Sequence, residues 1–207
     1  MTVTTLDPKT ALILIDLQKG ILSYPTVHPT EEVVKRSRAL AEAFRRHNLP
    51  VVLVNVAGVS PVRTEQSFKQ DPLPEGWTEL TPELNGQPSD YRVTKYTWGA
   101  FTHTDLEAYL RKYGITQVVI AGVATSFGVE STARSAYELG FNITLAIDAM
   151  TDMTLEAHNN SLTRIFPRLG GNRPDDRNNR FARQETETSV IFLRVIALIA
   201  GGKVLFS

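Results

Sequence analysis

Polar side chains that could do chemistry follow predicted strands at three places: at Asp16, at Lys95 and in the turn of residues 124–128. Residues 11–15 and 118–121 are apolar runs rich in β-branched residues, a pattern typical of strands buried on both faces. In an open parallel sheet, ligands bind in the crevice outside the carboxyl ends of the strands. The sequence therefore predicts a functional site at this edge of the sheet.

Asp16 and Lys95 together favour acid–base chemistry. At adjacent strand ends the two charges would be partly buried and would have to pair, because an isolated buried charge is strongly disfavoured. We expect the carboxylate and the ammonium to lie within about 4 Å of each other, the usual limit for an ion pair. The direction of the Asp16 pKa shift stays open, since burial raises this pKa and a neighbouring ammonium lowers it. A turn or helix-cap role for Asp16 and a solvated charge for Lys95 are the structural alternatives.

The turn of residues 124–128, ATSFG, lies between a predicted strand and a predicted helix. It resembles the sharp elbow that presents a nucleophile among backbone N–H groups, but Ala124 stands where the first glycine of Gly-x-Ser-x-Gly belongs. Ser126 would also need a base, and the pattern around the 4 histidines assigns none of them to this role. Hydrolysis through Ser126 is therefore an alternative to chemistry at Asp16.

Composition excludes several classes of function. The 207 residues include no cysteine, which excludes disulfides, thiolate metal sites and a cysteine nucleophile. There is no Gly-x-Gly-x-x-Gly motif, no phosphate-binding Gly-Lys-Ser/Thr loop and no zinc-type pair of histidines, so we expect neither a cofactor nor a metal. Lys plus Arg and Asp plus Glu both number 22, and this zero net charge creates no field that favours nucleic acid or an anionic membrane.

The first ten residues lack the basic and apolar regions of a signal peptide, so a cytoplasmic location is the default expectation. The longest apolar stretch, residues 190–200, is interrupted by Arg194 and is shorter than the roughly 20 residues that span a bilayer. We therefore expect no membrane partner.

Strands and helices alternate along the chain. Strands are predicted over residues 11–15, 51–56, 91–94, 115–122 and 143–148, and helices over residues 30–47, 104–113, 129–139 and 154–166. We expect Thr30 to be the N-cap of the first helix and Pro167 to end the last one. Residues 59–89 contain five prolines and predict a long excursion over the surface. The alternation predicts an α/β fold, a three-layer α-β-α sandwich with a mostly parallel, Rossmann-like central sheet.

Four ordered motifs at these strand ends resemble those of the isochorismatase-like hydrolases, which also include nicotinamidases and N-carbamoyl hydrolases. The motifs are residues 14–20 (LIDLQKG), Lys95 with residues 98–102 (WGAFT), residues 121–134 (AGVATSFGVESTAR) and residues 148–149 (DA). The resemblance extends from about residue 11 to residue 170.

The resemblance implies a catalytic site formed by Asp16, Lys95 and Gly128. Most members of this superfamily carry a cysteine nucleophile where Gly128 stands, so a thiolate mechanism is excluded and non-covalent acid–base catalysis at Asp16 is implied instead. We expect Gly128 to leave the space of the missing thiol open to substrate or water.

The resemblance also implies which residues contact a small-molecule substrate, and it implies a cis peptide bond between Val123 and Ala124. The implied substrate contacts are Gln18, Trp98, Phe101, Ala124, Ser126 and Phe127. The metal-binding residues of nicotinamidases have no clear counterpart near residues 63–65. A homo-oligomer, a dimer or tetramer, is implied as well.

The resemblance stops at residues 168–171, which predicts a hydrolase domain over residues 1–170 and an atypical C-terminal tail over residues 171–207. Residues 172–189 are polar without a clear period and are expected to be poorly packed, whereas residues 190–206 are apolar enough to need cover. A shifted reading frame or a foreign tail would produce such a change, and a genuine extension that docks on the domain or on a neighbouring subunit is the alternative.

The leading hypothesis is therefore a cofactor-free hydrolase of a small, anionic molecule with Asp16 as acid or base. The alternative from a different class is a non-catalytic ligand-binding or interaction protein that kept the crevice after losing the thiol. Replacement of Asp16 by Asn separates the two hypotheses, because a binding protein keeps its affinity while an enzyme loses its rate.

Overall fold

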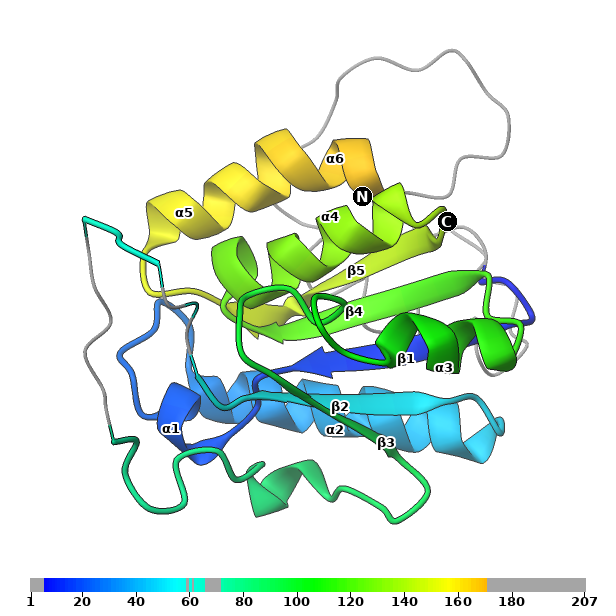
Figure 1. The fold of residues 1–207 in the computed structure, drawn as a ribbon, viewed down its shortest axis with the longest axis horizontal. Helices are drawn as coiled ribbons and strands as arrows, with labels where there is room; N and C mark the ends of the chain where they lie inside the picture. Colours follow the sequence, from blue (N-terminus) through cyan, green and yellow to red (C-terminus); the bar gives the residue numbers. More distant parts are fainter. Residues whose placement is uncertain (1–5, 59, 61, 66–71, 171–207) are drawn as a thin grey trace, which may run out of the picture.

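Five parallel strands form one sheet in the computed structural model, which describes residues 6–58, 60, 62–65 and 72–170 (Figure 1). The strands are β1 (Thr10–Ile15), β2 (Val51–Val56), β3 (Tyr91–Lys95), β4 (Gln117–Val123) and β5 (Asn142–Thr151). Their order across the sheet is β3-β2-β1-β4-β5, so β1 lies in the middle and pairs with β2 and β4. The predicted parallel sheet is confirmed.

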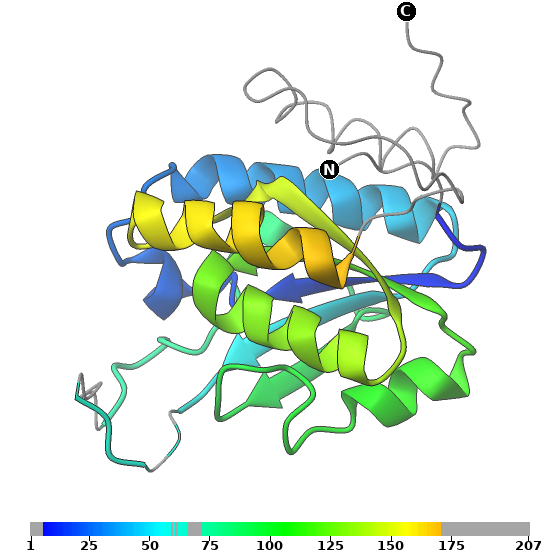
Figure 2. The same cartoon turned by 90° about the horizontal axis from the view of Figure 1, so that it is seen from above.

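Helices cover both faces of this sheet. They are α1 (Lys19–Leu22), α2 (Thr30–Arg46), α3 (Leu106–Lys112), α4 (Glu130–Glu138), α5 (Leu155–Asn160) and α6 (Phe166–Leu169), with a 3-10 turn η1 (Pro82–Leu84) and π-helical segments η2 (Thr125–Val129) and η3 (Ser161–Ile165). Figure 2 shows α2 on one side of the sheet and α3 and α4 on the other.

The alternation of side chains along β1 explains the three layers. Leu12 and Leu14 pack in the α2-side core with Phe44, whereas Ile13 and Ile15 pack in the core formed with α3 and α4. Every residue of β1 is buried because helices cover it on both faces, and such a strand reads as a continuous apolar run. The predicted α-β-α sandwich is confirmed.

Two predicted helix boundaries are wrong. Thr30 is the first residue of α2, Pro29 takes the N-cap position, and no side chain caps this helix. Pro167 does not end the last helix, because the chain passes through η3 and continues as α6 to Leu169. Pro167 falls in the first turn of α6, where its missing N–H removes no hydrogen bond within that helix.

The predicted excursion between β2 and β3 is confirmed for its described residues, which contain only the short turn η1 (Figure 1). Its segment around Leu80 forms an antiparallel bridge with Gln18, and the Trp77 ring packs directly on Gly20. The excursion is thereby held against the chain that follows Asp16.

The expectations for residues 172–189 and 190–206 fall outside the residues that the structure describes. Within the described ranges, no helix combines the length and the apolar character that a membrane crossing requires.

Candidate active site

Asp16 and Lys95 form a buried ion pair at the carboxyl ends of the strands. Asp16 directly follows β1 and adopts a left-handed conformation with φ 53°. The Lys95 Nζ donates to Asp16 Oδ2 at 2.8 Å and to the Thr97 carbonyl at 3.1 Å. The expected ion pair is confirmed, and only 2% of the Lys95 side chain and 6% of the Asp16 side chain are exposed.

The sequence led us to expect that Asp16 and Lys95 lie at the ends of adjacent strands. This expectation is wrong. Lys95 is the last residue of β3, and β2 lies between β3 and β1. The ion pair forms because the long lysine side chain reaches past the end of β2 to the carboxylate. Register supports this placement, since Lys95 is paired with Val56, the last residue of β2.

Burial raises the pKa of Asp16 to about 6, and the charge and hydrogen bond of the Lys95 ammonium oppose this rise. The Oδ2 atom accepts the hydrogen bond from Lys95, whereas the buried Oδ1 atom has no hydrogen-bond partner among the described residues. Buried polar atoms are normally hydrogen-bonded, so an unpartnered carboxylate oxygen is an unusual group that is available to a proton or a ligand. The carboxyl group can therefore exchange a proton near neutral pH.

The turn after β4 lies directly against Asp16. Gly122 is required before it, because φ is 122° and a Cβ would lie 2.1 Å from the Ile15 carbonyl oxygen. The peptide bond between Val123 and Ala124 is cis, as the resemblance implied.

Two N–H groups of this turn and that of the following Val129 already have partners. The Ser126 N–H donates to Asp152 Oδ2 at 2.6 Å, and the N–H groups of Phe127 and Val129 donate to the Ala124 carbonyl. The N–H groups of Ser126 and Phe127 are therefore not free to form an oxyanion-type site in this turn.

The expectation of open space at Gly128 is wrong. A Cβ at this position would lie 2.8 Å from Ile15 Cγ2 and 3.1 Å from Asp16 Oδ2. Gly128 is buried, and its lack of a side chain lets the backbone of the turn lie close to the Asp16 carboxylate.

Two of the predicted substrate contacts lie together beside the ion pair. Trp98 and Phe127 are 58% and 42% exposed, and their rings meet edge to face with centroids 5.1 Å apart. Trp98 follows Thr97, whose carbonyl binds Lys95, and Phe127 precedes Gly128. The aromatic pair therefore offers an apolar surface next to the two charges.

Three other predicted contacts are placed elsewhere. Gln18 is fully buried. Its side-chain Nε2 donates to the carbonyls of Val56 and Trp77, and its Oε1 accepts from the Val56 N–H, which leaves little hydrogen-bonding capacity for a substrate. Phe101 stacks on Phe141, which precedes β5 at the opposite edge of the sheet. Ala124 is buried in the α2-side core.

No histidine serves as a base for Ser126 in the described structure. The ring nitrogen of His158 contacts Thr125 Oγ1 at 2.9 Å instead, and no hydrogen bond joins the Ser126 hydroxyl to a histidine in the described ranges. Sequence reasoning missed the buried role of His158, because its partners come from segments far away in the chain.

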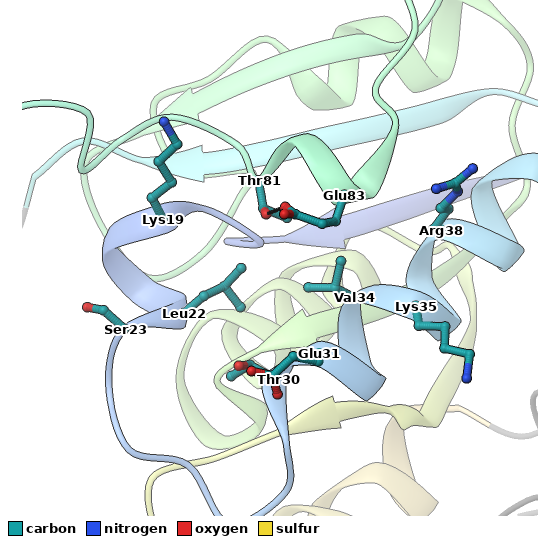
Figure 3. A pocket seen from close by; sticks show the side chains of 10 residues that line it. All are labelled: Lys19, Leu22, Ser23, Thr30, Glu31, Val34, Lys35, Arg38, Thr81 and Glu83. Carbon is teal, nitrogen blue, oxygen red and sulfur yellow. Dashed lines mark hydrogen bonds between the residues drawn. The ribbon is translucent and has the colours of Figure 1, made fainter.

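No group of three or more His, Cys, Asp or Glu side chains in the described ranges is arranged to hold a metal ion. A separate cavity of about 550 Å³ lies between α1, α2 and η1, with Val34, Thr81 and Glu83 among its lining residues (Figure 3). Asp16 and Lys95 are not part of its lining.

Comparison with known proteins agrees with this geometry. Residues 10–172 match the isochorismatase domain family. The chain is 44% identical over 169 residues to the uncharacterized isochorismatase family protein YecD of Escherichia coli O157:H7, a match that covers 77% of this chain and 89% of YecD. It is 41% identical over 172 residues to YwoC of Bacillus subtilis, a further uncharacterized isochorismatase family protein, covering 80% and 89% of the two chains.

A solved structure of an isochorismatase family protein from Burkholderia thailandensis has the same fold. It superposes with a TM-score of 0.78 at 43% identity and covers 82% of this chain and 93% of its own. Residues 10–172, which match the family model, include Asp16, Lys95 and the turn after β4. The chain therefore belongs to the isochorismatase family of hydrolases.

Proposed function

We propose that this protein hydrolyses a small, anionic molecule by acid–base catalysis at Asp16, without a cofactor and without a covalent intermediate. The observation that carries the proposal is the buried Asp16 Oδ1, which has no hydrogen-bond partner among the described residues, on a carboxyl group whose pKa is raised to about 6. Efficient proton transfer needs a group whose pKa lies near the working pH.

The preference for an anion follows from the charges of the pair. When Asp16 carries a proton on Oδ1, the Lys95 ammonium beside it is no longer neutralised, and the site has a net positive charge. The buried position of both groups strengthens this field, because little water screens it. The exposed Trp98 and Phe127 rings would cover the apolar part of the substrate.

The proposed reaction begins with protonated Asp16. Its proton passes from Oδ1 to the substrate as the bond to the leaving group breaks, while Lys95 holds Oδ2 and fixes the orientation of the carboxylate. A water molecule adds to the electron-poor carbon that results, and the proton it releases returns to Asp16. The net change is the addition of one water molecule across the cleaved bond, and no group on Gly128 takes part.

Replacement of Asp16 by Asn tests this function. We expect the rate with any substrate found in a screen of small anionic ethers, esters and amides to fall by roughly 10²–10⁴, because the amide cannot donate or take up the proton. Substrate affinity, measured by calorimetry, should change little. The matched control is Glu156→Gln, which removes an exposed carboxylate on α5 and should leave the rate unchanged.

Three results would contradict the proposal. Unchanged turnover in Asp16→Asn would exclude acid–base catalysis at this residue, and binding without turnover of any compound would favour the non-catalytic alternative. Intact-mass spectrometry during turnover should find unmodified protein, whereas an acyl adduct on Ser126 would establish a covalent route.

A further inference from the structure

A cluster of buried polar side chains lies behind the turn after β4. The His158 Nδ1 contacts Thr125 Oγ1 at 2.9 Å, and the Thr125 hydroxyl donates to the Thr151 carbonyl at 3.0 Å. His158 is only 5% exposed, and Thr125 and Thr151 are fully buried. The cluster joins the start of η2 to the end of β5 and to α5.

These contacts favour one of the two neutral tautomers of His158. The hydroxyl of Thr125 has one proton, and it gives that proton to the Thr151 carbonyl. The hydroxyl oxygen then accepts a hydrogen bond from the ring, which favours the tautomer with the proton on Nδ1 of His158.

A second contact holds the next residue of the turn. The fully buried Asp152 accepts the Ser126 N–H on Oδ2 at 2.6 Å and the Met153 N–H on Oδ1 at 2.7 Å. The two successive residues Thr125 and Ser126 are therefore both held from the segment that follows β5. The same turn, two residues later, brings Gly128 against the Asp16 carboxylate.

The surroundings of His158 favour its neutral form. Burial lowers the pKa of His158, the neighbouring His28 ring lowers it further, and Asp152 opposes both effects. The His28 ring meets the His158 ring at 60° with centroids 4.8 Å apart. A neutral ring keeps one donor nitrogen, which is what the contact with Thr125 requires.

We propose that His158, as the Nδ1–H tautomer, and Asp152 are positioning residues that hold the turn of residues 124–128 closed over the Asp16 carboxylate. Neither residue touches the reacting atoms in this arrangement. They act through the turn, which shields Asp16 from bulk water and so keeps its pKa above that of an exposed aspartate. The catalytic meaning of this role rests on the proposed function, whereas the closure of the turn can be measured without a substrate.

The experiment is nuclear magnetic resonance on the full chain with labelled histidine and aspartate. In the wild type, the His158 ring should show the Nδ1–H tautomer, and the carboxyl carbon of Asp16 should titrate near pH 6. Two variants follow. His158→Asn keeps a donor close to the Nδ1 position, and His158→Phe keeps a ring but removes the donor.

We expect the Asp16 titration to stay near the wild-type value in His158→Asn and to move down by about 1 pH unit or more in His158→Phe, because a loosened turn lets water reach the carboxylate. His47→Phe, at an exposed position after α2, is the control and should leave the titration unchanged. Thr125→Val removes the acceptor with little change of shape and should lower the Asp16 titration as His158→Phe does.

An Nε2–H tautomer of His158 in the wild type would overturn the proposal, and this measurement needs no variant to fold. An unchanged Asp16 titration in both His158→Phe and Thr125→Val would overturn it as well. Failure of the proposed function would give a different result. Turnover would survive in Asp16→Asn, while the His158 tautomer and the Asp16 titrations would remain as expected.

Discussion

At the scale of single residues, the properties of Asp16 come from two opposing effects of its surroundings. Removal from water favours the neutral acid, and the ammonium of Lys95 favours the carboxylate. The balance leaves the Asp16 pKa at about 6, well above the value of 3.8 for an exposed aspartate. The same burial that makes the group difficult to ionise thus makes it a useful proton donor.

The pH dependence of catalysis follows from this pKa. If Asp16 donates the proton, the active form is the protonated one, so kcat/KM should be highest below about pH 6 and fall roughly tenfold per pH unit above it. A pH profile of kcat/KM measures this. In Lys95→Met the fall should begin at higher pH, because the lost ammonium no longer lowers the Asp16 pKa. A profile that rises through pH 6 would assign Asp16 the role of a base.

Gly128 gives a second prediction at the residue scale. Gly128→Ala should lower the free energy of unfolding by about 1–3 kcal/mol, because its Cβ would overpack Ile15 Cγ2 at 2.8 Å. Urea unfolding of this variant measures the loss. In an Ile15→Ala background, which lacks the obstructing methyl group, Gly128→Ala should cause a smaller loss of unfolding free energy than it does in the wild type.

The control for this prediction is Gly99→Ala, whose Cβ would meet its neighbours at ordinary distances of 3.5 Å and more. Its unfolding free energy should stay within about 0.5 kcal/mol of the wild type. Equal losses in Gly128→Ala and Gly99→Ala would show that the turn can move away from Ile15 without penalty.

At the scale of elements, strands that are buried on both faces were the part that local sequence predicted best. The predicted strand over residues 51–56 coincides with β2, since its β-branched residues lie between two helical layers. The end of the last helix was mispredicted because the π-helical segment η3 changes the register before Pro167. No local pattern announces such a change, which depends on packing against other elements.

The long connection between β2 and β3 gives a prediction at this scale. Gly20→Ala should displace the Trp77 ring, because the new Cβ would lie 2.2 Å from atoms of that ring. The chain has 2 tryptophans, so Trp98→Phe leaves Trp77 as the single fluorophore. In that background Gly20→Ala should shift the emission to longer wavelength and increase quenching by acrylamide.

Gly99→Ala in the same background is the matched control and should leave the emission of Trp77 unchanged. Trp77 is 8% exposed in the native structure, so a gain in solvent contact should be readily visible. Identical spectra for Gly20→Ala and its parent would mean that the excursion is not held at Gly20.

At the scale of the whole molecule, the sequence predicted the ion pair but not the strand order that produces it. Asp16 and Lys95 were identified because both follow strand-like segments, and parallel strands bring their ends to one edge. The order β3-β2-β1 depends on long-range pairing, so the intervening β2 could not be inferred. The stacking of Phe101 on Phe141 could not be inferred either, because it joins segments that are brought together by tertiary packing.

We propose that residues 1–170 form a domain that folds without the rest of the chain. The two described core clusters are built from residues between Leu6 and Leu169. A chain that ends after Gly170 should therefore unfold cooperatively, with a free energy within about 1 kcal/mol of the full-length value. Thermal and urea unfolding of both chains test this. A shortened chain without a cooperative transition would show that residues 171–207 are required for folding.

The central position of β1 has a consequence for how the protein inactivates. Its residues pair on both sides, with β2 and with β4, so the strand that precedes Asp16 is protected from the fraying that begins at edges and loops. Partial opening of the excursion or of α5 leaves this strand in place. We therefore expect the backbone that anchors the carboxylate to open only with the sheet, whereas the turn that closes over it should open earlier, together with α5.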